Sequence, residues 1–197
     1  MSKESIVTKA LQCIDEVYPF DNDINMDGFP TDAFIDEVVR WVIDIVAPSK
    51  LTNREELEFD SMTLDADGVG RGDIDGGTRL GRLVYFRAKG WEIPVVGAIT
   101  EDNILYRQQK NKVLRGNPSR PVVAIVENRG KLEWYTAKEE GVDSAYHVPY
   151  DIEFIPPELV DLAAWKLAET VLLSMSDAQS AATCTAKVNE QLQMLAL

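Results

Sequence analysis

Apolar residues recur at helical spacing in two segments near the start of the chain. Residues 4–18 place apolar side chains on one helical face, and Pro19 follows them. Residues 31–47 repeat the pattern, with Thr31 in the position of a helix cap. The two faces consist of Ile6, Val7, Ala10, Leu11, Ile14, Val17 and Tyr18, and of Phe34, Val38, Trp41, Val42 and Ile45. Both segments predict amphipathic helices that need partners for stability.

The pattern changes in the middle of the chain, where short runs rich in β-forming residues replace the helical spacing. These runs are 83–86, 95–99, 122–126 and 131–136. The last two flank Asn128-Arg129-Gly130 and predict a β-hairpin. In its second strand Leu132, Trp134 and Thr136 share one face, and Lys131, Glu133 and Tyr135 share the other. No helix long enough for a parallel crossover separates the runs, so we expect an antiparallel sheet or barrel.

The end of the chain returns to helix. Pro156-Pro157-Glu158 is typical of a helix start, and the residues from 159 to 175 are apolar on more than one face. This breadth predicts burial on two sides, either in the centre of a bundle or against a neighbouring chain. Ser176-Asp177 is placed to cap a last helix, whose apolar positions are Ala181, Cys184, Val188, Leu192 and Leu195.

The order of these segments predicts an α+β fold. Two N-terminal and two C-terminal helices, from residues 1–56 and 150–197, are expected to form a four-helix bundle. Residues 57–149 are expected to form an antiparallel β subdomain inserted between them.

Composition narrows the class of protein. The chain has 197 residues, of which 45% are hydrophobic, enough for a substantial core. Its 2 cysteines are too few for a disulfide scaffold. No apolar run approaches the length of about 18 residues that a membrane span requires, and residues 1–4 do not resemble a signal peptide. We expect a protein that has no membrane partner and acts where it is made or assembled.

Charge is unevenly distributed along the chain. The formal net charge is -13, but residues 71–138 contain 13 basic and 7 acidic residues, whereas the flanks contain 7 basic and 26 acidic residues. An acidic molecule repels nucleic acid phosphates, which opposes nonspecific binding. The two compositions are consistent with a solvated acidic surface and one basic loop, or with two parts that face different partners.

Two acidic stretches resemble calcium loops only in part. Residues 23–28 place Asp23, Asn25 and Asp27 at alternate positions before Gly28, but Phe34 stands where the loop needs a carboxylate. A polar turn before a helix is favoured there. The stretch 65–76 lacks ligands at two positions, and a mobile glycine-rich loop is favoured.

The single histidine, His147, lies among apolar residues, which favours a structural role over that of a general base. The chain contains no G-x-S-x-G nucleophile motif and no phosphate-binding glycine motif. We therefore predict no catalytic residue, no metal and no cofactor. Two alternatives stay open: a cytoplasmic calcium- or small-ligand-binding module based on residues 23–27, and a hydrolase with His147 as its base.

Two segments are candidate interfaces for subunits or partners. A polar stretch from Tyr106 to Pro121 contains five basic residues, Arg107, Lys110, Lys112, Arg115 and Arg120. They suit a solvated connection, a nucleic-acid surface, or a contact with an acidic surface of another copy. The apolar end of the chain, with Leu192, Met194 and Leu195, suits a core helix or an interface equally.

Three stretches together resemble a known family. They are the opening helix pair up to Ala47-Pro48, the hairpin from Pro121 to Tyr135, and residues 155–168 followed by the last helix. In order and spacing they resemble the head-to-tail adaptor subunits of tailed bacteriophages, which include podovirus tail tubular protein A and the ring proteins of crAss-like phages. Residues 65–81 have no counterpart in that resemblance.

The resemblance implies a noncatalytic ring subunit in about twelve copies, docked below the portal. Such a ring would contact the portal and neighbouring tail or ring proteins, and would surround a channel through which DNA passes without specific binding. The implied location is the head–tail junction of the virion, after assembly in the host cytoplasm. Opposed acidic and basic regions suit the heterologous contacts of a ring, in which different surfaces of two copies meet.

Overall fold

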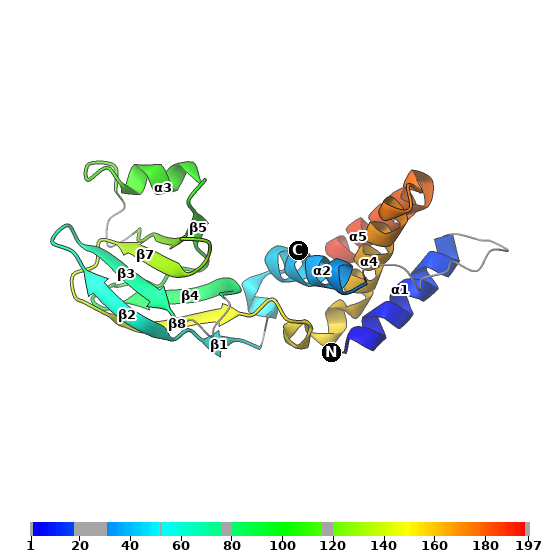
Figure 1. Cartoon of the computed structure of the whole chain (residues 1–197), viewed down its shortest axis with the longest axis horizontal. Coiled ribbons are helices and arrows are strands. Elements are labelled where there is room, and N and C mark those ends of the chain that lie inside the picture. The colour runs from blue at the N-terminus through cyan, green and yellow to red at the C-terminus, as the bar shows by residue number, and fades with distance from the viewer. Residues whose placement is uncertain (1, 18–30, 52, 76–79, 116–119, 196–197) are drawn as a thin grey trace. The chain divides into compact units, whose positions relative to one another are not determined.

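The computed structural model describes residues 2–17, 31–51, 53–75, 80–115 and 120–195 (Figure 1). The chain divides into two compact units, a helical unit of Met1–Asn53 with Tyr150–Leu197 and a β unit of Arg54–Pro149. The boundaries expected from the sequence were 57 and 149. The mixed α+β class is confirmed, with five α-helices and two sheets among the described residues.

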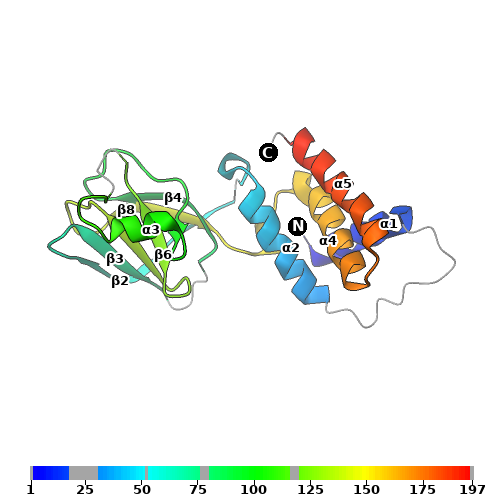
Figure 2. The ribbon, with the colours of Figure 1, turned by 90° about the horizontal axis from the view of Figure 1, so that it is seen from above.

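The helical unit contains four long helices around its own core (Figure 2). They are α1 (Lys3–Val17), α2 (Thr31–Ile45), α4 (Val160–Ser174) and α5 (Ala178–Met194). Three short 3₁₀ helices accompany them: η1 (Pro48–Lys50), η2 (Ile152–Phe154) and η3 (Pro157–Leu159). Every helix in the described parts of the chain is too short or too polar to cross a membrane.

Helix α4 is the centre of this unit, because α1, α2 and α5 all pack against it. Its alanines permit close approach, and Ala163, Ala164 and Ala168 are completely buried. The predicted burial of this helix on more than one face is therefore confirmed. The described residues show no four-helix bundle, however. In a bundle all four helices surround a common axis, whereas here α1, α2 and α5 surround α4. The bundle stays a prediction.

The last helix begins as the sequence suggests. The carboxylate of Asp177 accepts a hydrogen bond from the backbone N–H of Ser180 at 3.1 Å, which satisfies a donor left open at the helix start. Ala181, Cys184 and Val188 are buried.

The β unit contains two sheets. The first has the order β1-β8-β4 and the second β2-β3-β7-β6-β5. The strands are β1 (Glu55–Glu56), β2 (Phe59–Leu64), β3 (Val69–Ile74), β4 (Arg82–Ala88), β5 (Ile99–Thr100), β6 (Val123–Val126), β7 (Lys131–Tyr135) and β8 (Val142–Val148). One apolar cluster, which includes Phe86, Trp91 and Trp134, unites residues of both sheets. A smaller cluster lies on the opposite face of the five-stranded sheet.

The predicted antiparallel sheet is wrong for one pair of strands. Strand β5 pairs with β6 in parallel, with Ile99 opposite Ala124. The connection between them contains the short helix α3 (Ile104–Gln109). The connection from residue 101 to 122 is long enough for a parallel crossover without a long helix, and the sequence pattern gave no sign of α3.

The predicted hairpin is confirmed in β6 and β7, where Val123 lies opposite Trp134. Its turn, residues 127–130, contains Gly130 as expected, although Gly130 does not itself have a left-handed φ. The left-handed conformation falls on Glu127, Asn128 and Arg129, with φ of 50°, 51° and 71°. The alternation of the second strand is also confirmed, because Leu132 and Trp134 lie in the inter-sheet core and Tyr135 in the other cluster.

The stretch 65–76, expected to be a mobile loop, is corrected by the structure. Its residues 69–74 form β3, inside the five-stranded sheet, and Asp65 closes a tight turn before it. Gly70 and Gly72 lie directly under aromatic rings, which leave no room for a side chain. A Cβ atom at Gly70 would lie 2.0 Å from Nε1 of Trp134, and one at Gly72 would lie 2.5 Å from the ring of Phe59.

Candidate functional site

Residues 101–115, here named the α3 segment, cover the outer face of the five-stranded sheet (Figure 1). The side chain of Asn103 caps α3 by accepting a hydrogen bond from the N–H of Leu105 at 2.9 Å. Tyr106 packs on the smaller apolar cluster, beside Tyr135 and Val126. Tyr106 thus anchors the segment on the sheet, while most of the residues from 101 to 115 are exposed, in keeping with the expected solvated connection between strands.

A buried carboxylate, Glu133 on β7, links the α3 segment to the sheet. Its Oε2 atom accepts hydrogen bonds from Lys110 Nζ at 2.7 Å and from the Tyr135 hydroxyl at 2.7 Å. The Tyr106 hydroxyl lies 3.3 Å from the same atom. The other oxygen, Oε1, accepts from Arg71 Nε at 3.1 Å. Four donors from three elements thus converge on one acid.

The electrostatics of this cluster favour the ionised carboxylate. Burial alone would raise the pKa of Glu133, but the hydrogen bonds from Lys110, Tyr135 and Arg71 outweigh it and lower that pKa. Burial and the bond to Glu133 both raise the pKa of Tyr135, which keeps its hydroxyl a donor. Glu133 at neutral pH is therefore a fixed anion and not a proton carrier.

A second acid, Asp67, holds the far end of the α3 segment. Its carboxylate lies 2.6 Å from Lys112 Nζ, and its backbone oxygen accepts a hydrogen bond from Arg115 at 2.7 Å. The Arg115 guanidinium also lies over the ring of Tyr135, 5.7 Å from its centroid. Most of the basic residues of the candidate interface thus have partners within their own β unit.

The remaining residues of the two candidate interfaces differ in their exposure to solvent. Arg107 and Arg120 have no ion-pair partner in the described part of the chain. At the end of the helical unit Met194 is 64% exposed, and Leu192 and Leu195 are partly buried. The structure brings Lys110, Lys112 and Arg115 together on the α3 segment; the C-terminal residues belong to the other unit.

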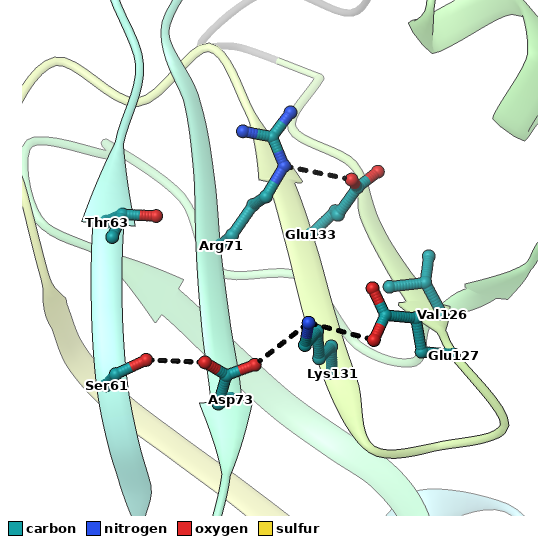
Figure 3. Close-up of a pocket in the computed structure, with 8 residues that line it drawn as sticks. All are labelled: Ser61, Thr63, Arg71, Asp73, Val126, Glu127, Lys131 and Glu133. Atoms are coloured by element: carbon teal, nitrogen blue, oxygen red, sulfur yellow. Dashed lines mark hydrogen bonds and ion pairs between the residues drawn. The ribbon is translucent and has the colours of Figure 1, made fainter.

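A pocket of about 190 Å³ opens beside Glu133 on the same face of the sheet (Figure 3). It is lined by Ser61, Thr63, Arg71, Asp73, Val126, Glu127, Lys131 and Glu133. These side chains come from the neighbouring strands β2, β3, β6 and β7 and from the hairpin turn.

The charged groups of this pocket are paired with one another. Asp73 accepts a hydrogen bond from Ser61 Oγ at 2.6 Å and lies 3.4 Å from Lys131 Nζ, which is 2.8 Å from Glu127. The bond from Ser61 lowers the pKa of Asp73, with a smaller contribution from Lys131. Asp73 and Glu133 are both ionised at neutral pH, so neither is suited to general acid–base catalysis there.

The single histidine is a structural residue of β8, as predicted. Its side chain is buried, and Nδ1 accepts a hydrogen bond from the backbone N–H of Gly81 at 3.2 Å. Burial lowers the pKa of His147, which keeps the imidazole neutral. Nε2 has no hydrogen-bond partner among the described residues. Glu55, opposite His147 on β1, has a smaller and opposite effect on that pKa.

Neither cysteine is placed to react as a thiolate. Burial raises the pKa of Cys13 to about 11 and that of Cys184 to about 12, so both thiols stay protonated. The described residues contain no group of three or more histidine, cysteine or acidic side chains placed to hold a metal ion. Asp23, Asn25 and Asp27 of the partial calcium motif lie outside the described residues.

Sequence reasoning missed the acids that bind the basic residues. Glu133 lies on the polar face of a correctly predicted strand, and that face alone suggested exposure to solvent. The sequence did contain the partners of this acid, because Tyr106 and Lys110 lie in the basic stretch and Tyr135 lies two residues after Glu133. That these residues meet Glu133 can be recognised only when the position of α3 on the sheet is known.

No protein-family model matches the chain, and no curated protein matches it either.

Proposed function

We propose that the chain is a noncatalytic structural subunit of a head-to-tail adaptor ring, located below the portal at the head–tail junction of a tailed bacteriophage. The observation that carries this proposal is that the candidate site combines paired charges with exposed apolar side chains. Lys110, Lys112 and Glu133 are paired with neighbours in the same unit, while apolar side chains of the α3 segment are exposed to solvent. Such a surface suits contact with protein rather than chemistry.

The order of units supports the proposal. The chain leaves the helical unit, forms the β unit and returns to the helical unit, which is the order of the three stretches that resemble adaptor subunits. A ring of about twelve copies would use such a chain for lateral contacts and for contacts with the portal and neighbouring tail or ring proteins. We also propose that the four long helices form a four-helix bundle in the assembled ring.

The charges support passive passage of DNA. The net charge is -13, and Lys110, Lys112 and Arg115 are occupied by groups of their own unit. A ring built from such subunits would repel phosphates instead of retaining them, so DNA would slide through its channel.

The proposal is tested in the virus that encodes the chain. We expect an early stop codon in this gene to yield DNA-filled heads without attached tails, and expression of the intact chain in trans to restore complete particles. A cryo-EM map of the head–tail junction should contain the chain as a ring. Complete infectious particles assembled without the chain, or a substrate turned over by the purified protein, would overturn the proposal.

A further inference from the structure

Strand β2 is one edge of the five-stranded sheet, and no strand in the described part of the chain pairs with its outer side. At its end the backbone N–H of Asp65 donates to the backbone oxygen of Val69 at 3.0 Å. Backbone groups alternate in direction along an antiparallel strand, so those of Thr63 face β3, and those of Met62 and Leu64 face the open edge. The outward groups have no partner among the described residues. They are donors and acceptors for one more strand.

The apolar core beneath this edge is incompletely covered. Met62 lies opposite Gly72 in the register of β2 and β3, on the face of the sheet that Trp134 covers. Phe59 and Leu64 of the same strand pack against the core and are partly buried, but Met62 is 36% exposed. A strand added beside β2 would place an apolar side chain against Met62 and remove it from water.

The pocket on the other face of the sheet begins at the same strand (Figure 3). Ser61 and Thr63 of β2 line it, and both residues are small and exposed. They lie between the open edge and the lining residues of β3 and β7. A long side chain from a strand added to β2 would therefore pass over them into the pocket.

The pocket has room for a further positive charge. Its lining contains three carboxylates, those of Asp73, Glu127 and Glu133, and two cations, Arg71 and Lys131. Arg71 pairs with Glu133, whereas Asp73 and Glu127 share the single ammonium group of Lys131. A lysine from a partner would supply a second cation for these two acids.

Charge along the edge favours the same kind of partner. Residues 55–70 contain six acidic residues and no basic one. Glu56 and Glu58, just before β2, are exposed and have no ion-pair partner among the described residues. This edge attracts a basic segment and repels an acidic segment or a nucleic acid backbone.

We infer that the outer edge of β2 binds an extended segment of a partner protein, in which apolar and basic residues alternate. The segment adds to the sheet as an antiparallel strand through hydrogen bonds to the backbone of Met62 and Leu64. Its apolar side chains cover Met62, and a neighbouring lysine reaches Asp73 through the pocket. In this mode of recognition the backbone bonds supply affinity and the pocket supplies specificity. The inference goes beyond the adaptor function and does not depend on it.

The first experiment measures binding of the full chain to a labelled, capped peptide of alternating lysine and valine by fluorescence anisotropy. In the inferred register the valines lie opposite Met62 and Leu64, and their N–H groups donate to β2. N-methylation of the valines should therefore weaken binding about tenfold or more, whereas N-methylation of the lysines, whose N–H groups face solvent, should not. A peptide of alternating glutamate and valine should not bind. Loss of binding on lysine methylation instead would overturn the antiparallel register.

Variants of the chain test the same contact from the other side. Met62→Pro removes an outward N–H and no bond to β3, so we expect binding to weaken about tenfold. Asp73→Asn should weaken it about fivefold, because the new ion pair is partly exposed. Asp143→Asn is the matched control, since Asp143 is also 45% exposed and ion-paired but lies in the other sheet. Thermal unfolding of each variant shows whether its fold is intact, and equal effects of the two asparagine variants would overturn the role of the pocket.

Amide hydrogen exchange measured by NMR locates the peptide on the unaltered chain. Saturating peptide should slow exchange at Met62 and Leu64, whereas Ser61 and Thr63, whose N–H groups already face β3, should change little. No binding of the lysine–valine peptide, or binding that slows neither Met62 nor Leu64, would overturn the inference. Slower exchange at these two amides at high protein concentration without peptide would assign the edge to a second copy of the chain, and would overturn the inferred partner.

Discussion

The ammonium group of Lys110 lies 2.7 Å from Oε2 of Glu133, and this ion pair joins the end of α3 to β7 in the five-stranded sheet. The lysine is half exposed, while the side chain of Glu133 is only 10% exposed. Glu133 accepts hydrogen bonds from Lys110, Arg71 and Tyr135. The bond from Lys110 fixes the end of α3 on the sheet.

Replacement of Glu133 is expected to loosen this layer. Glu133→Gln would leave Lys110 and Arg71 beside a neutral group, and the free energy of unfolding should fall by about 2 kcal/mol, less than for fully buried pairs because both cations are half exposed. Urea unfolding followed by tryptophan fluorescence measures it. Glu127→Gln is the control, since Glu127 is 61% exposed and its pair with Lys131 should contribute about 0.5 kcal/mol. Equal losses in the two variants would contradict this role of Glu133.

A second prediction concerns the close packing of β3 on Trp134. Gly70→Ala would place a Cβ atom 2.0 Å from Nε1 of that ring, so the indole or the strand must shift. We expect a loss of about 3 kcal/mol and a changed near-ultraviolet circular dichroism spectrum.

The control for this prediction is Gly130→Ala in the hairpin turn. The nearest atom there is the backbone oxygen of Glu127 at 3.3 Å, and φ is not left-handed. Its effect should stay within about 1 kcal/mol. An unchanged stability of Gly70→Ala would show that β3 does not pack as described.

The same strand shows why the sequence predicted the helices better than the sheet. The apolar spacing that predicts α1, α2, α4 and α5 lies within each helix itself. The hairpin of β6 and β7 likewise joins residues that are close in sequence. Gly70 and Gly72 carry no side chain, so their part of β3 has no apolar alternation to read. Their role is visible only once Trp134 and Phe59, distant in sequence, lie over them.

The candidate site was predicted in part for a similar reason. The basic stretch was identified from composition, and four of its five basic residues, all but Arg120, lie on the α3 segment. Composition cannot reveal that Glu133 and Asp67 neutralise Lys110 and Lys112, because that depends on the path of α3 back across the sheet. The surface left for partners is consequently the apolar one, Ile104, Val113 and Leu114, which the charge pattern did not indicate.

The third prediction uses the fact that the chain contains 1 histidine, so that NMR signals of imidazole belong to His147. Burial lowers its pKa, and the titration midpoint should lie below the ordinary value of about 6.5. Because Nδ1 accepts the Gly81 N–H, the neutral ring must carry its proton on Nε2, which 15N chemical shifts report.

This titration also sets a pH dependence of stability. The folded pKa of His147 lies below the unfolded one, so the unfolded chain binds the proton more tightly. The contribution of His147 is therefore complete above about pH 6.5 and is lost as the pH falls toward the folded pKa. A midpoint above 6.5, or a proton on Nδ1, would contradict the described environment.

The last prediction concerns the contact of α4 with α5. Glu169 is buried in the helical unit, where it accepts hydrogen bonds from Thr185 Oγ1 at 2.6 Å and from Lys166 Nζ at 2.6 Å. Thr185→Val keeps the shape of the side chain but removes the donor to a charged acceptor, which should lower the free energy of unfolding by about 1.5 kcal/mol. Thr183 is exposed on the same helix, as Thr185 is, but makes no hydrogen bond to Glu169, so Thr183→Val should change it by less than about 0.5 kcal/mol. If Glu169→Gln makes the Thr185→Val effect smaller, the two side chains are coupled through this bond; additive losses would show that Thr185 acts on stability independently of Glu169.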